Sequence, residues 1–209
     1  MTQTQGVYRA VVTDVRDKEG MGRVQVEVRD AAPGAAPGAA RDTEPDAALE
    51  PMWARVSTLM AGDRRGTWFV PDVGDEVLVA FQGGDPRQPI VLGSLWSASD
   101  RPPETMDPAG RNAVRVIRTG AGLEIRLDDA AERVVVSTPD GASITLEHGT
   151  VRIQASGSVE IDASQMTLSA GLLQVQAGMA RFGGVVQCDT LVANSVVASS
   201  YTPGAGNVW

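Results

Sequence analysis

Pairs of apolar residues, each separated by one residue, recur every seven or eight residues through the second half of the chain. In the stretch ITLEHGTVRIQASGSVEIDASQMTLSAG (144–171), Gly, Ala, Ser and Asp occupy many of the positions between the pairs. An i, i+2 pair places two side chains on one face of a short strand, and small residues let the chain turn between strands. The members of this series that we predict to be buried are Val116, Ile125, Val134, Val136, Ile144, Leu146, Val151, Ile153, Val159, Ile161, Met166, Leu168, Leu173 and Val175.

A strip of such short strands is too narrow to cover its own apolar face, because each repeat touches only its near neighbours. Three copies wound about a common axis form a triangular prism in which every pair points inward. A single-chain parallel β-solenoid, as in polysaccharide-degrading enzymes, is the alternative, although its coils are usually longer. Periodicity alone leaves both arrangements open.

The first half of the chain shows short alternating strands with turn residues between them and no helical periodicity. RVQVEVRD (23–30) alternates valine with polar residues, which is the pattern of a half-buried strand. Such a series predicts a small closed barrel. The expected strands are 7–15, 23–30, 52–60, 66–71, 75–82 and 88–96.

Composition divides the chain further. Residues 31–50 are rich in Ala, Pro and Gly and are interpreted as a flexible, solvated insertion. Three prolines in 98–112 indicate a stiff linker between two domains. The predicted organisation is a barrel domain at 1–97, the linker, a repeat domain at 113–200 and a terminal segment at 201–209.

Charge and cysteine content limit the possible functions. The formal net charge is −8, which argues against non-specific attraction to nucleic acid. The single cysteine, Cys188, excludes an intrachain disulfide. The first residues lack the basic and apolar regions of a signal peptide, so we expect synthesis and assembly in the cytoplasm.

Three motifs carry a family resemblance: PDVGDEVLVAF (71–81), GGDPRQP (83–89) and VLGSLW (91–96). Together they resemble the oligonucleotide/oligosaccharide-binding (OB) barrel of contractile-tail spike proteins. These are the baseplate V proteins of phages, the VgrG spikes of type VI secretion and the spikes of extracellular injection particles. The resemblance implies an all-β fold, with an N-terminal OB-fold barrel followed by an intertwined trimeric β-helix (a triangular β-prism).

The resemblance also implies a mechanical role without catalytic residues or cofactors. A homotrimer would join a separate hub or baseplate protein, at the OB domain, to a PAAR-type tip protein, and would pierce the target cell envelope when the sheath contracts. The particle, a phage tail or injection machine, would assemble in the cytoplasm. Aromatic and apolar residues near the end of the chain, Tyr201, Val208 and Trp209, are the predicted tip-docking residues.

Other residues of the sequence could indicate metal binding or catalysis. His148 is predicted to be a solvated corner residue and not a metal ligand, because the corners of a prism face outward and a tetrahedral site needs four ligands. The sequence also lacks the His-x-His motif of iron-binding spike tips. Acidic residues that could suggest glycoside cleavage are interpreted as turn residues, Cys188 as a small buried residue, and the barrel aromatics as core. The acidic residues are Asp128, Asp129, Glu132 and Asp140; the aromatics are Trp53, Trp68, Phe69, Phe81 and Trp96.

Two alternative functions therefore remain. The first is a solenoid-type polysaccharide-degrading enzyme. The second is a nucleic-acid-binding OB module, in which aromatics and the adjacent Arg64 and Arg65 would contact a single strand.

Overall fold

The computed structural model describes residues 6–29 and 50–200 of the chain. Nearly all of the predicted insertion at 31–50, and the predicted tip-docking residues Tyr201, Val208 and Trp209, lie outside the described residues. The chain divides into two compact units, residues 1–159 and 160–209.

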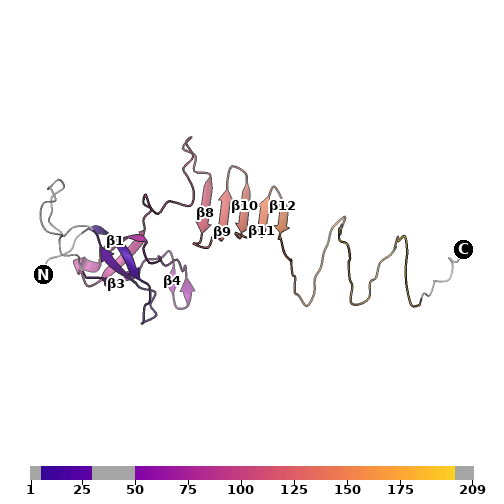
Figure 1. The fold of residues 1–209 in the computed structure, drawn as a ribbon, viewed down its shortest axis with the longest axis horizontal. Coiled ribbons are helices and arrows are strands. Elements are labelled where there is room, and N and C mark those ends of the chain that lie inside the picture. Colours follow the sequence, from indigo (N-terminus) through magenta and orange to yellow (C-terminus); the bar gives the residue numbers. More distant parts are fainter. Residues whose placement is uncertain (1–5, 30–49, 201–209) are drawn as a thin grey trace. The chain divides into compact units, whose positions relative to one another are not determined.

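The first part of unit 1 is a closed barrel of five strands in the order β1-β2-β3-β7-β6 (Figure 1). Neighbouring strands are antiparallel except β3 and β7, which run parallel. An all-β chain with this closed barrel fits the OB fold predicted from the sequence. The strands are β1 (Val7–Asp14), β2 (Val24–Val28), β3 (Met52–Val56), β6 (Glu76–Phe81) and β7 (Pro89–Ser94).

Alternation along these strands supplies the barrel core. In β2 the three valines are buried and the residues between them are half-buried, as period-two burial requires. The core has ten buried side chains, and most are valines whose branched side chains pack well on a pleated sheet. They are Ala10, Val12, Val24, Val26, Val28, Ala54, Val77, Val79, Phe81 and Val91.

Between β3 and β6 the chain departs from the expected strands. The prediction of a strand at 66–71 is wrong, because this segment contains only the end of a small hairpin formed by β4 (Ala61–Gly62) and β5 (Arg65–Gly66). A 3-10 turn, η1 (Gln82–Gly84), connects β6 to β7.

The aromatic residues predicted to lie in the core do so only in part. Phe81 is 7% exposed and packs edge-on against Tyr8. Trp68, Phe69 and Trp96 are 76%, 69% and 71% exposed, so their assignment to the core is wrong. All three lie outside the barrel strands, where the alternation of inward and outward positions no longer applies.

The second part of unit 1 is a five-stranded antiparallel meander in the order β12-β11-β10-β9-β8 (Figure 1). Each strand has five residues and follows its neighbour through a short turn, as the apolar-pair spacing predicts. The strands are β8 (Val114–Arg118), β9 (Glu124–Asp128), β10 (Arg133–Ser137), β11 (Ser143–Glu147) and β12 (Thr150–Gln154).

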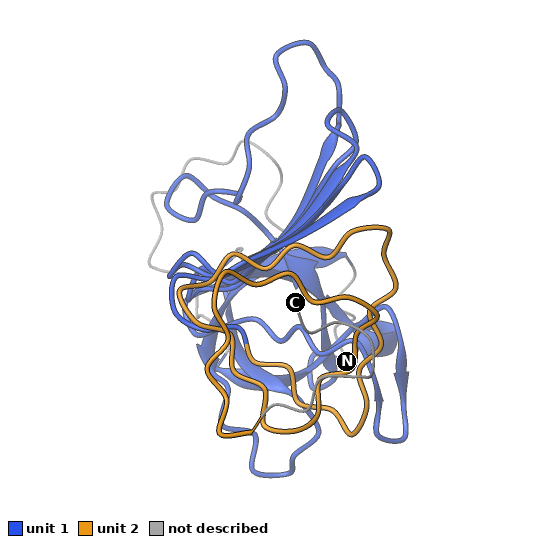
Figure 2. Cartoon of the chain, turned by 90° about the vertical axis from the view of Figure 1, so that its right-hand side faces the viewer, with its two compact units in different colours: residues 1–159 blue, residues 160–209 orange. Residues whose placement is uncertain are grey.

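Residues 155–200 contain no strand, although the apolar rhythm of the sequence continues through them. Figure 2 shows residues 160–200 (orange) as successive open loops. Every residue from 155 to 200 is exposed, including Cys188, which the sequence interpretation placed in a buried position. Within the described ranges, no helix is long and apolar enough to cross a bilayer.

Candidate assembly interface

The register of the meander gathers the apolar pairs on one face. Residues directly opposite each other in antiparallel strands have side chains on the same side of the sheet. Ile125 is opposite Val136, and Val136 is also opposite Ile144. One continuous row is therefore Ile125, Val136, Ile144 and Ile153, and the second is Leu127, Val134, Leu146 and Val151.

The structure differs from the sequence expectation at Val116. In the pairing of β8 with β9, Val116 is opposite Arg126, whereas Ile117 is opposite Ile125. Val116 therefore lies on the polar face, and Ile117 takes the place expected for it. A shift of one position along a strand exchanges the two faces, and the sequence VRVIR has apolar residues on both.

In the meander, the apolar face is more exposed to solvent than the polar face. Ile125, Ile144 and Ile153 on the apolar face are 41%, 43% and 56% exposed. On the other face, the polar residues of β9, such as Glu124 and Arg126, are only half-exposed. A one-sided antiparallel sheet normally packs its apolar face and solvates its polar face. No segment among residues 6–29 and 50–200 therefore covers the apolar face of β9–β12.

The linker covers part of the polar face. Arg126 Nη1 donates to Glu104 Oε2 at 2.5 Å, and Arg118 Nη1 donates to the Pro103 carbonyl at 3.4 Å. Arg118 Nε also donates to Glu124 Oε2 at 2.6 Å. The pKa of Glu104 is lowered by the Thr105 backbone N–H and by Arg126. These contacts attach the linker to β8 and β9, which linker composition alone did not predict.

His148 lies in the two-residue turn between β11 and β12, where Glu147 pairs with Thr150. Its φ of 46° and the φ of 76° at Gly149 are both positive, as in a type I′ hairpin turn. The imidazole is exposed, and its Nδ1 is 4.0 Å from Glu147 Oε1. Among residues 6–29 and 50–200, no three His, Cys, Asp or Glu side chains are grouped so as to hold a metal ion.

Three of the four acidic residues singled out in the sequence have structural partners in or beside turns. Asp128 accepts from the Ala131 backbone N–H at 3.0 Å, and Asp129 forms an ion pair with Arg115 at 2.9 Å. Asp140 accepts from the Thr138 hydroxyl, which lowers the pKa of its carboxyl. The antiparallel meander also differs from the parallel coils of the solenoid alternative.

Residues 8–96, which span most of the barrel, match the family model of the type VI secretion system/phage-baseplate injector OB domain. The barrel is therefore an OB domain of this injector class, and the resemblance to contractile-tail spike proteins is confirmed. The chain is VgrG/baseplate-V-like over this part.

Individual spike proteins are also similar to this chain in sequence. The type VI secretion system spike protein VgrG5 of Pseudomonas aeruginosa is 35% identical over 105 residues, which are 46% of this chain and 13% of that protein. VgrG3 of Vibrio cholerae is 31% identical over 101 residues, 46% of this chain and 10% of that protein. The actin cross-linking toxin VgrG1 of Vibrio cholerae is 44% identical over 54 residues, 26% of this chain and 5% of that protein. The matched part is thus a small fraction of each relative.

Proposed function

We propose that this chain is the structural central spike of a contractile injection machine, a phage tail or a phage-like particle. Three copies join through their repeat regions into a triangular β-prism. The spike connects the tube or hub to a tip protein and pierces the target envelope when the sheath contracts. The injector OB domain and the VgrG relatives support this role.

The uncovered apolar face of β9–β12 is the observation that carries the proposal. Its two rows hold eight apolar side chains in register, and no segment of the described chain covers them. Burial of one such side chain contributes ~1.5–3 kcal/mol before conformational entropy is subtracted. Large exposed apolar surfaces of this kind mark protein interfaces.

The same reasoning extends to residues 155–200. Val159, Ile161, Met166 and Leu168 continue the apolar rhythm, yet all are exposed and no backbone ladder holds them. A chain that lacks both a core and strand partners obtains them when two other chains wind beside it. Interwound chains separate only if they unthread, so the trimer would be kinetically stable.

The proposed spike binds a different partner protein at each end. A hub or baseplate protein binds the OB domain, and a PAAR-type tip protein binds Tyr201, Val208 and Trp209 at the C-terminal end. Assembly takes place in the cytoplasm before the spike becomes part of the particle. The role is mechanical and uses no cofactor.

The mass of the protein in solution tests the trimer. We expect a species of three times the 21.9 kDa of one chain that resists heat and detergent. Ile144→Asp places a charge on the apolar face and should abolish this species. Thr145→Asp, on the polar face of the same strand, should leave it intact. A wild-type mass of one chain would overturn the proposal.

Removal of residues 199–209 tests the tip. The truncated protein should keep the mass of three chains and lose binding to a purified PAAR-type protein. Unchanged binding would show that the tip docks elsewhere on the spike.

A further inference from the structure

Exposed apolar side chains gather at one end of the OB barrel. Strand pairings define this end: β1, β3 and β7 finish there, and β2 and β6 begin there. The segments at this end are the β1–β2 turn, the chain between β3 and β6, and the exit from β7. They carry eight exposed large apolar residues: Val15, Met21, Leu59, Met60, Trp68, Phe69, Val73 and Trp96.

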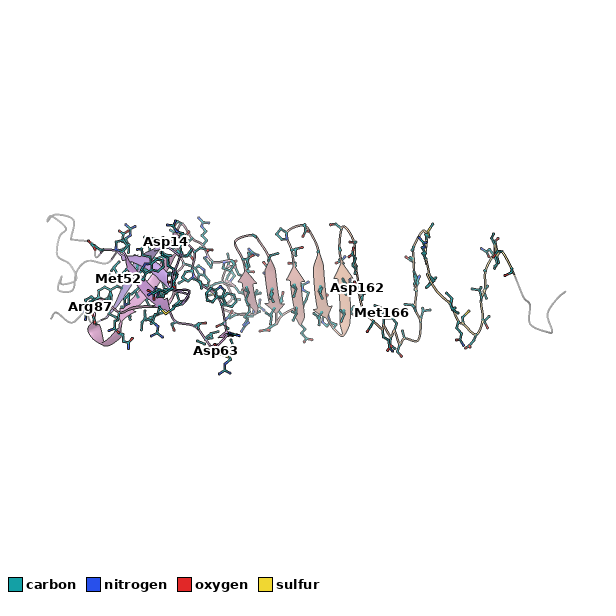
Figure 3. The ribbon with its side chains drawn as sticks, turned by 90° about the horizontal axis from the view of Figure 1, so that it is seen from below. Asp14, Met52, Asp63, Arg87, Asp162 and Met166 are labelled. Carbon is teal, nitrogen blue, oxygen red and sulfur yellow. The ribbon has the colours of Figure 1, made fainter. Side chains whose placement is uncertain are left out.

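At the opposite end of the barrel, the described connection is polar and not apolar. The β6–β7 connection there reads QGGDPRQ, and Arg87 forms an ion pair with Asp85 at 2.9 Å. Figure 3 shows Arg87 at this end, and Asp63, in the β4–β5 hairpin, at the apolar end. Only the apolar end leads through Trp96 into the linker and the meander.

A groove of about 590 Å³ lies at the apolar end between the β1–β2 turn and the β4–β5 hairpin. Its lining includes Met21, Met60, Trp68 and Phe69. The Trp68 ring lies so close to Gly22 that a Cβ there would be 2.9 Å from it. The φ of 69° at Gly22 favours glycine there, and the Trp68 ring forms a wall of the groove.

The turn that forms the other wall is held firmly. The Asp17 carboxylate accepts from the backbone N–H groups of Glu19, Met21 and Arg23 at 3.1, 2.8 and 3.2 Å. It also accepts from Arg23 Nη2 at 2.8 Å, and the Arg23 guanidinium lies over the Trp53 ring. Hydrogen bonds therefore hold the β1–β2 turn that forms this wall of the groove.

The groove and the turn before β6, at the same end of the barrel, carry side chains of opposite charge. Arg64 and Arg65 line the groove and supply positive charge beside its apolar wall. The turn before β6 presents an exposed Val73 between Asp72 and Asp75. One surface is apolar with cations, and the other is apolar with carboxylates, so the two are complementary.

We propose that the groove receives the Asp72–Asp75 turn of a second copy of this chain. The inference rests on the proposed trimer, because three meanders that share an axis bring together the barrel ends from which they leave. A head-to-tail contact between a groove and a turn repeats around a threefold axis and closes into a ring. The OB barrels therefore form a second ring of contacts, separate from the apolar face of the meander.

Thiol accessibility in the full chain tests this contact. Cys188→Ala removes the native thiol, and Met60→Cys then places one thiol in the groove. Met106→Cys, on the exposed linker, is the matched control. In the assembled protein the thiol at position 60 should react with a maleimide about tenfold more slowly than the thiol at 106. After denaturation the two rates should be equal.

Charge reversal identifies the occupant. Arg64→Glu with Arg65→Glu should abolish the protection at position 60, and Asp72→Arg added to this pair should restore it. Equal rates at 60 and 106 in a protein of three-chain mass would overturn the barrel contact and leave the proposed spike intact. A one-chain mass would overturn both. Protection that depends on added single-stranded DNA would assign the groove to nucleic acid and refute the inference.

Discussion

The barrel and the meander use the same period-two alternation and reach opposite outcomes. In the barrel, Val77 and Val79 are completely buried. In the meander, no residue of the five strands is buried, although the apolar rows are equally regular. Alternation creates an apolar face, and closure or a partner must then cover it.

The difference arises from how each sheet ends. The barrel strands pair around a closed circle, so the inward side chains of one strand meet those of the others. The meander is open, and each of the strands β9–β12 carries two apolar side chains on one face. A sheet of this kind gains a core only when a second layer covers its apolar face.

The largest expected effect comes from a charge in the barrel core. Val79→Asp buries an unpaired carboxylate, which costs several kcal/mol and should unfold the barrel at every protein concentration. Circular dichroism and urea titration measure the loss. A folded barrel in this variant would mean that Val79 is not enclosed as the structure shows.

A cavity in the meander should act only through assembly. Ile153→Ala should cost about 2–4 kcal/mol per chain in the assembled form and nothing in the dissociated chain. The thermal midpoint should therefore depend on protein concentration in this variant. Arg152→Ala, on the polar face of the same strand, is the control and should change the midpoint little. An equal effect of both variants would contradict an apolar interface.

Acid should weaken the barrel through its paired carboxyls. Hydrogen bonds from Arg16 and Arg87 lower the pKa of Asp14 and of Asp85 to about 2, and those from Arg23 lower the pKa of Asp17 further. Because each folded-state pKa lies below the unfolded value of 3.8, the stabilisation is present above pH 4 and is lost as the pH falls toward 2.

Asp17→Asn tests the largest of these contributions. The urea midpoint of the variant should be lower than that of the wild type at pH 6 and should depend less on pH between 4 and 2. Parallel pH curves for the two proteins would rule out this role for Asp17.

The smallest effect concerns the β11–β12 turn. His148 adopts a left-handed φ that asparagine accepts more readily, so His148→Asn should stabilise the hairpin by about 0.5 kcal/mol. His148→Val, a β-branched control, should destabilise it. The measurement is the thermal midpoint at a fixed protein concentration, since neither variant changes the apolar rows.

Much of the barrel followed from local patterns. RVQVEVRD forms β2 because its valines alternate, and the motifs of 71–96 by themselves indicate the OB barrel. Trp68, Phe69 and Trp96 could not be placed in the same way. They lie beyond the strand ends, where position along the sequence no longer specifies a face.

The apolar rows of the meander contain the residue pairs expected from the sequence, except in β8. Apolar pairs identified its rows, but the face of β8 depends on hydrogen-bond register, which puts Ile117 and not Val116 in line with Ile125. The contact of Glu104 with Arg126 joins residues that are 22 positions apart. The prolines of the linker predict that it is stiff, but they do not predict which residues it contacts.

The sequence by itself determined the β-strand period, the small-residue turns and the injector-type OB barrel, because these depend on neighbouring residues and on a specific set of motifs. Tertiary structure alone decided which side of the meander is covered, where the exposed aromatics gather and which groups the linker binds. Those outcomes depend on register, strand closure and contacts between distant residues, and each is settled only when the whole chain is folded.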